Sequence, residues 1–119
     1  MPQASVTMTT RKLNDSTSSI DIDGEINAFA ENILMDAYTR ATSDGARIII
    51  LNFSELDYMN SSGIGLLVTL LIRANRQKQR LLATGLNNHY RQIFELTRLS
   101  EAISIYPTES DAVESLNGK

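Results

Sequence analysis

Alternating polar and apolar positions predict the strands of this chain. The alternation is weak around Val6 and Met8 and regular over residues 19–23, which favours two strands, the second ending at Gly24. A continuous apolar run within residues 47–52 is typical of a strand that is covered on both faces. Shorter runs at residues 81–83 and 103–106 complete the predicted strands.

Helical spacing separates these strands. Phe29, Ile33 and Ala37 recur every four residues, which predicts a helix over residues 29–42. Further helices are predicted over residues 61–77, 88–96 and 110–116, and residues 56–60 are expected to form a loop. Strands that alternate with helices predict an α/β fold, in which helices back a sheet with some parallel pairs.

The predicted helix over residues 61–77 is apolar on much of its circumference. Its expected core face holds Ile64, Leu67, Val68 and Leu71, and the face beside it holds Leu66, Thr69, Leu70 and Arg73. Two interpretations remain open for the second face. The helix packs on two sides within the domain, or Leu66 and Leu70 belong to a patch that binds another protein.

Composition and charge narrow the classes of function. A chain of 119 residues is expected to form one domain, with a core from Ser5 to Leu116 and short flexible ends. A net charge of -3 argues against nucleic acid as a main partner. No signal peptide is recognisable, and the longest apolar stretch, at 64–72, is too short to span a membrane. We therefore expect a cytoplasmic monomer or weak dimer that does not bind membranes.

The residues give little support to catalysis or to a bound cofactor. There is no cysteine, which excludes disulfides and thiolate sites, and His89 is the only histidine. Gly63 and Gly65 resemble part of a phosphate-binding loop, but the third glycine and the lysine of such loops are missing. We expect no metal, no cofactor and no enzymatic activity.

The segment before the helix at residue 61 is the most informative part of the chain. Asn60, Ser61 and Ser62 are all residue types that cap helices, so the serines are explained by capping alone or by regulation. A phosphate on such a serine is favourable at a helix start, and it places new charge under any protein docked there. The residues alone leave both interpretations open.

Four segments together resemble the STAS family of bacterial anti-sigma factor antagonists. They are Gly-Glu-Ile at 24–26, Ile-Ile-Ile-Leu-Asn at 48–52, Tyr-Met-Asn-Ser-Ser-Gly-Ile-Gly at 58–65 and Ile-Phe-Glu-Leu-Thr-Arg-Leu at 93–99. The resemblance implies a mixed sheet with helices on one face. It also implies binding to an anti-sigma factor that is itself a serine kinase, release of the complex by phosphorylation, and reversal by a serine phosphatase.

The resemblance also assigns the residues of the site. Ser61 takes the place of the phosphorylated serine, and Ser62 is the second choice. The expected contacts to the partner are Asn27, Asn60, Ser62, Gly63, Gly65, Leu66, Thr69, Leu70 and Arg73.

Two residues depart from the pattern of the family. Asn60 stands where the motif usually has an aspartate, and Asn27 replaces the aspartate that usually follows Gly-Glu-Ile. Losing these charges eases the accommodation of a phosphate, or it removes contacts that a kinase uses. In the second case the chain is an unphosphorylated adaptor in another bacterial signalling complex.

Overall fold

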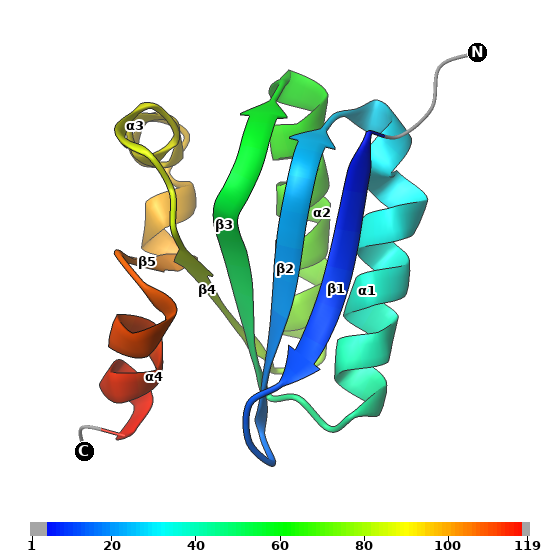
Figure 1. Cartoon of the computed structure of the whole chain (residues 1–119), viewed down its shortest axis with the longest axis vertical. Helices are drawn as coiled ribbons and strands as arrows, with labels where there is room; N and C mark the ends of the chain where they lie inside the picture. The colour runs from blue at the N-terminus through cyan, green and yellow to red at the C-terminus, as the bar shows by residue number, and fades with distance from the viewer. Residues whose placement is uncertain (1–4, 118–119) are drawn as a thin grey trace.

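A mixed five-stranded sheet forms the centre of the computed structural model, which describes residues 5–117 (Figure 1). The strand order follows the chain, and β1 is antiparallel to β2 while the other neighbours are parallel. The strands are β1 (Val6–Lys12), β2 (Thr17–Ile26), β3 (Ile48–Met59), β4 (Arg80–Thr84) and β5 (Ser104–Tyr106). The expected flexible ends include residues 1–4 and 118–119, which lie outside the described residues.

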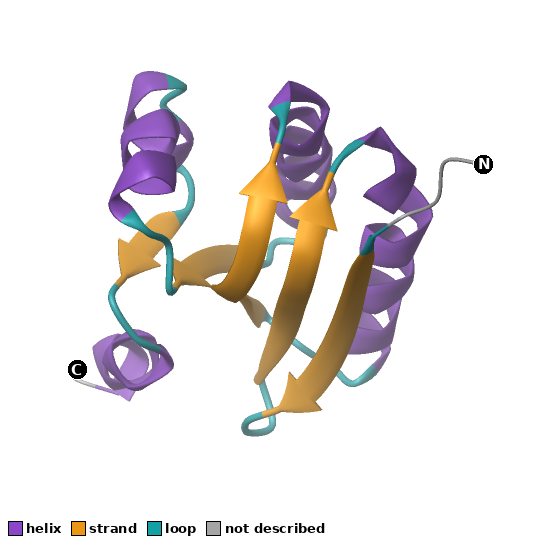
Figure 2. Cartoon of the chain, turned by 45° about the horizontal axis from the view of Figure 1, so that its top comes forward, coloured by secondary structure: helices purple, strands orange, loops and turns teal. Residues whose placement is uncertain are grey.

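Helices connect the parallel strands and pack against the sheet (Figure 2). They are η1 (Ala28–Ala30), α1 (Glu31–Ser43), α2 (Ser61–Arg76), α3 (Asn88–Leu96), η2 (Leu99–Glu101) and α4 (Glu109–Asn117). Both bounds of each α-helix lie within two residues of the predicted ones. No helix within residues 5–117 is both long and apolar enough to cross a membrane.

The strands bury apolar side chains on two faces of the sheet. Ile49 and Leu51 point into the main core, which α1, α2 and α3 share with β1 to β4. Ile50 and Leu82 point the opposite way and form a smaller cluster with Ala112 of α4, because side chains alternate along a strand. The predicted mixed α/β sheet is confirmed. Most of its helical cover lies on one face, and α4 covers part of the other.

Two predicted boundaries in the strands are wrong. Residues 56–59 belong to β3 and not to a loop, and β2 continues through Gly24 to Ile26. Register shifts between β2 and β3 disturb the alternation in this region. Gly24 fits because its φ of 115° suits glycine, and a Cβ atom there would lie 2.2 Å from the backbone oxygen of Ser5.

Candidate functional site

The start of α2 lies where β2 and β3 end. Asn60 has extended backbone angles, and its side-chain oxygen accepts a hydrogen bond of 2.9 Å from the backbone N–H of Gly63. The backbone N–H of Asn60 donates to the carbonyl of Ile26 at 3.2 Å. The first hydrogen bond caps α2, and the second fixes its start to the end of β2.

Asn27 plays the corresponding role on the neighbouring strand. Its side-chain oxygen accepts a hydrogen bond of 2.9 Å from the N–H of Phe29 and caps η1. Ile26 and Met59 pair in register at the ends of β2 and β3, so the turns that follow them lie side by side. The two asparagines that depart from the family pattern are therefore both helix caps.

Ser61 and Ser62 are the first two residues of α2, and both are exposed. Neither hydroxyl forms a hydrogen bond within residues 5–117. The side-chain cap of α2 comes from Asn60 instead. The unpaired backbone N–H groups of a helix start carry partial positive charge, which suits a phosphate. The structure thus assigns capping to Asn60 and leaves both serine hydroxyls exposed.

Gly63 has a packing role that the sequence did not reveal. The residue is buried, and a Cβ atom on it would lie 2.4 Å from the backbone oxygen of Ile26 and 2.8 Å from Cγ of Met59. This packing by itself requires a glycine at position 63, and the expected contact of Gly63 with a partner stays a prediction. Gly65 is different, since it is exposed and a Cβ atom there would meet nothing within 4 Å.

The buried face of α2 differs from the predicted one. Leu70 has 0% exposure and packs in the core with Leu67 and Ala74, so its expected place in a surface patch is wrong. Val68, which was assigned to the core, is 40% exposed. The buried row of α2 consists of Gly63, Leu67, Leu70 and Ala74. Their spacings of four, three and four are those that a helix of 3.6 residues per turn requires.

An exposed row on α2 runs along the helix from Ser61. Gly65, Val68 and Ile72 follow it at spacings of four, three and four, and Ile72 is 49% exposed. Of the other expected contacts on α2, Leu66 is half-buried, while Thr69 and Arg73 are exposed. Val68 and Ile72 were missed by the sequence analysis, although their spacing from Ser61 was a usable signal.

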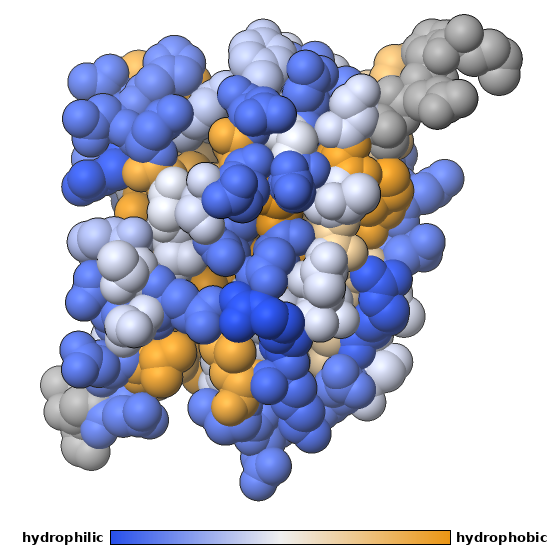
Figure 3. Space-filling view, in the orientation of Figure 1, coloured by the Kyte–Doolittle hydropathy of each residue, from blue (hydrophilic) through white to orange (hydrophobic). Residues whose placement is uncertain are grey.

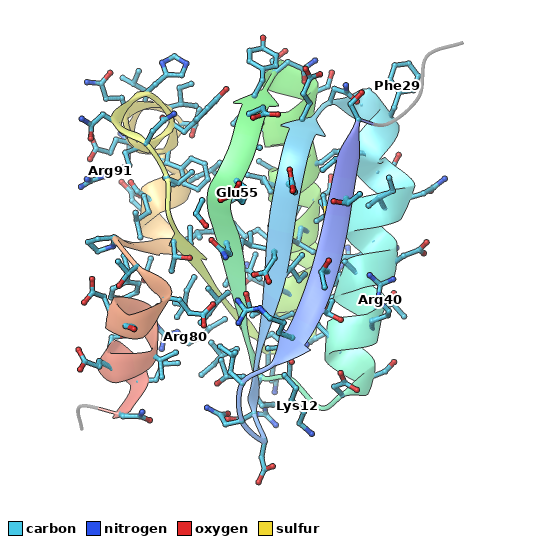
Figure 4. All side chains as sticks on the ribbon, in the orientation of Figure 1. Lys12, Phe29, Arg40, Glu55, Arg80 and Arg91 are labelled. Atoms are coloured by element: carbon cyan, nitrogen blue, oxygen red, sulfur yellow. The ribbon has the colours of Figure 1, made fainter. Side chains whose placement is uncertain are left out.

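Two exposed aromatic side chains lie near the start of this row, at Ser61. Phe29, labelled in Figure 4, lies in η1, which packs beside α2. Tyr58 is the second-to-last residue of β3. Tyr90 of α3 secures that strand end, since its hydroxyl accepts a hydrogen bond of 2.8 Å from the N–H of Met59. The ring of His89 packs edge-on against Tyr90, with centroids 4.8 Å apart.

No group of three or more histidine, cysteine or acidic residues that could hold a metal ion is found among residues 5–117. The candidate site that the structure brings together consists of exposed hydroxyls, asparagine caps and exposed apolar side chains. It comprises Asn27, Asn60, Ser61, Ser62, Gly65, Val68 and Ile72.

Comparisons with known proteins point to one family. The model of the STAS domain matches residues 9–112. An anti-sigma-B factor antagonist of Staphylococcus aureus is 28% identical over 91 residues, which cover 76% of this chain and 84% of that protein.

Solved structures share the fold at low sequence identity. An anti-sigma factor antagonist from Mycobacterium paratuberculosis superposes with a TM-score of 0.79 and 20% identity, over 98% of this chain and 99% of that one. The Bacillus cell fate determinant SpoIIAA in its phosphorylated form gives a TM-score of 0.71 and 22% identity, over 92% and 99% of the two chains.

Proposed function

Because the chain belongs to the STAS domain family, we propose that it is an anti-sigma factor antagonist that phosphorylation of Ser61 switches off. Relatives carry that function in their names, and one solved relative is a phosphorylated form. The observation that carries the proposal is the position of Ser61. An exposed hydroxyl with no hydrogen bond among residues 5–117 heads an exposed row that includes two apolar side chains.

A phosphate at this position changes binding without changing the fold. The helix start tolerates the charge, since free N–H groups and the helix dipole favour an anion there. A partner packed over Gly65 and Val68 would meet about -1.5 to -2 charges with their bound water. A 1000-fold loss of affinity requires only about 4 kcal/mol, which charge repulsion and desolvation are able to supply.

The geometry of α2 favours Ser61 over Ser62 as the acceptor. Ser61 is aligned with Gly65 and Val68, whereas Ser62 is aligned with the half-buried Leu66. A phosphate on Ser61 therefore lies closest to the apolar surface that we assign to the partner. Ser62 is exposed as well, and it serves as the comparison in any test.

The two asparagines are compatible with this switch. Asn27 and Asn60 make capping hydrogen bonds that aspartate would also make, but they do so without a negative charge. A phosphate on Ser61 consequently experiences less repulsion from these two neighbours than it would beside aspartates. This supports easier phosphate accommodation over the loss of the switch.

The proposal includes the partners and the setting of the switch. The partner that phosphorylates and so inactivates the chain is an anti-sigma factor with serine kinase activity. A serine phosphatase removes the phosphate and restores the chain to its active form. The chain acts in the cytoplasm as one domain with its core from Ser5 to Leu116, without binding nucleic acid.

Phosphorylation with the cognate kinase tests the acceptor. We expect mass spectrometry to find one phosphate after incubation with the kinase and ATP, absent from Ser61→Ala and present on Ser62→Ala. Calorimetry should show that Ser61→Asp lowers affinity for the anti-sigma factor by at least about 100-fold, or about 2.7 kcal/mol. Its unfolding free energy should stay within about 1 kcal/mol of the wild type.

The possible results separate the switch from the adaptor function. Labelling that survives Ser61→Ala would show that the acceptor is wrong. A tight complex with the partner and no phosphate on either serine would favour the unphosphorylated adaptor. Absence of binding to any anti-sigma factor would contradict both.

A further inference from the structure

One face of the sheet carries acidic side chains that no helix within residues 5–117 covers. Asp23, Glu25 and Glu55, here called the acidic face, are exposed on the side of β2 and β3 that faces away from α1 and α2. Glu55 is labelled on this face in Figure 4, and Figure 3 shows that the surface is largely hydrophilic. The packing of α4 involves the other end of β3, at Ile48 and Ile50, so it leaves the acidic face open.

The carboxylates of the acidic face form no ion pair with any residue in the range 5–117. Asp23 and Glu55 are register partners on neighbouring parallel strands and line a hollow of about 230 Å³. Like charges in neighbouring positions destabilise a sheet. Among residues 5–117 the ion pairs are Arg11 with Asp21, Arg11 with Glu109, and Arg98 with Glu101, so none involves the acidic face.

A basic surface of matching character lies at the other end of the molecule. Arg73, Arg76, Lys78 and Arg80, here called the basic end, are exposed at the end of α2 and the start of β4. None of the four is in an ion pair among residues 5–117. Arg73 and Arg76 also line a hollow of about 230 Å³ with Tyr38 and Gln77.

One chain is unable to bring these two surfaces together. Arg73 and Arg76 belong to α2, which packs on the opposite side of the sheet from Asp23 and Glu55. The 16 residues of α2 extend over about 24 Å, away from the strand ends near the acidic face. Figure 4 shows the same separation, with Glu55 in the upper half and Arg80 in the lower half.

We propose that the acidic face binds the basic end of a second copy of this chain. The planar guanidinium groups of Arg73 and Arg76 match the geometry of carboxylates, and they would neutralise the like-charged pair Asp23 and Glu55. In such a pair, one copy keeps an unused basic end and the other keeps an unused acidic face. The contact is therefore head-to-tail and adds further copies instead of closing as a symmetric dimer.

This association goes beyond the proposed switch and does not depend on it. Ser61 starts α2, and the basic end lies at the other end of the same helix. Exposed charges are screened by salt, so the association is expected to be weak and strongly dependent on ionic strength.

Sedimentation velocity of the unmodified full chain tests the proposal. We expect the weight-average sedimentation coefficient to rise with protein concentration at about 20 mM salt, and to show a monomer at about 500 mM salt. Asp23→Lys/Glu55→Lys and Arg73→Glu/Arg76→Glu should each be monomeric at low salt. An equimolar mixture of the two should associate again, because each reversed surface then meets its complement.

A matched control separates the contact from net charge. Glu95 and Glu114 are exposed on α3 and α4, away from both surfaces. The variant Glu95→Lys/Glu114→Lys therefore changes the net charge as much as Asp23→Lys/Glu55→Lys does, without altering either surface. This variant should retain at least about half of the low-salt association, measured as the association constant. A monomeric wild type at low salt would overturn the proposal and leave the acidic face to a different, basic protein. A mixture that stays monomeric, or reversed variants that still associate, would also overturn it.

Discussion

Gly63 and Gly65, in the first turns of α2, differ in what surrounds their Cα atoms. Gly63 packs against the backbone of Ile26 and the side chain of Met59, whereas Gly65 faces open space. We expect Gly63→Ala to lower the free energy of unfolding by about 2–3 kcal/mol, since a backbone carbonyl must move to admit the methyl group. Gly65→Ala should raise it by up to about 1 kcal/mol through helix propensity. Urea unfolding of both variants measures the difference, and equal stability would contradict the assigned packing role.

The same residues show what sequence can predict at this scale. Three cap-type residues in a row predicted a helix start correctly, but only backbone angles show that Asn60 is the cap. The close approach to Gly63 was not predictable, because Ile26 is far away in sequence and reaches Gly63 only through the pairing of β2 with β3. Local chemistry thus located the candidate site, and tertiary packing showed that Asn60 is the cap and that Gly63 is buried.

At the scale of the elements, α2 illustrates a limit of hydrophobic patterning. Its bounds were predicted to within one residue, but its buried face was not. Apolar residues occupy most of its circumference, so periodicity alone does not distinguish the buried Leu70 from the exposed Val68. The end of β3 was missed for a related reason, since register shifts against β2 interrupt the alternation that marks a strand.

The exposed row of α2 leads to a prediction about affinity. Val68→Ser and Ile72→Ser should each weaken binding of the anti-sigma factor by about tenfold, or about 1.4 kcal/mol, because each removes apolar contact area. Calorimetry measures the affinity, and the unfolding free energy should change by less than about 1 kcal/mol since both residues are exposed. Leu96→Ser is the matched control, because Leu96 is 84% exposed on α3 and should leave affinity unchanged. Equal losses in all three variants would refute a specific role for α2.

At the scale of the whole molecule, Arg11 connects three elements that are distant in sequence. Its guanidinium group on β1 donates hydrogen bonds to Asp21 on β2, one of them 2.8 Å long, and to Glu109 at the start of α4. The small apolar cluster beneath α4 also links that helix to the sheet. Hydrogen bonding to the two carboxylates raises the pKa of Arg11, so the guanidinium group stays charged. This clamp joins the N-terminal strand to the C-terminal helix.

The clamp makes stability dependent on pH in the acid range. The hydrogen bond from Arg11 is the main cause that lowers the pKa of Asp21, with smaller contributions from Asn52 and Ser19, while partial burial opposes it. Because the folded pKa lies below the unfolded value of about 3.9, the unfolded state binds more protons in this range. The stabilisation is therefore complete at neutral pH, where Asp21 is ionised in both states. It is lost as the pH falls from about 4 through the folded pKa.

A double-mutant cycle isolates this contribution. Asp21→Asn should cost about 0.5–1 kcal/mol at pH 7, as expected for a partly exposed ion pair, and progressively less as the pH falls below about 4. In an Arg11→Met background the same substitution should cost close to nothing at either pH, because the main cause of the lowered pKa is gone. Urea unfolding of the four proteins between pH 7 and about pH 2.5 measures these differences. A cost of Asp21→Asn that survives without Arg11 would mean that Asp21 stabilises the fold through Asn52 and Ser19. A cost that is independent of pH would contradict the lowered pKa of Asp21.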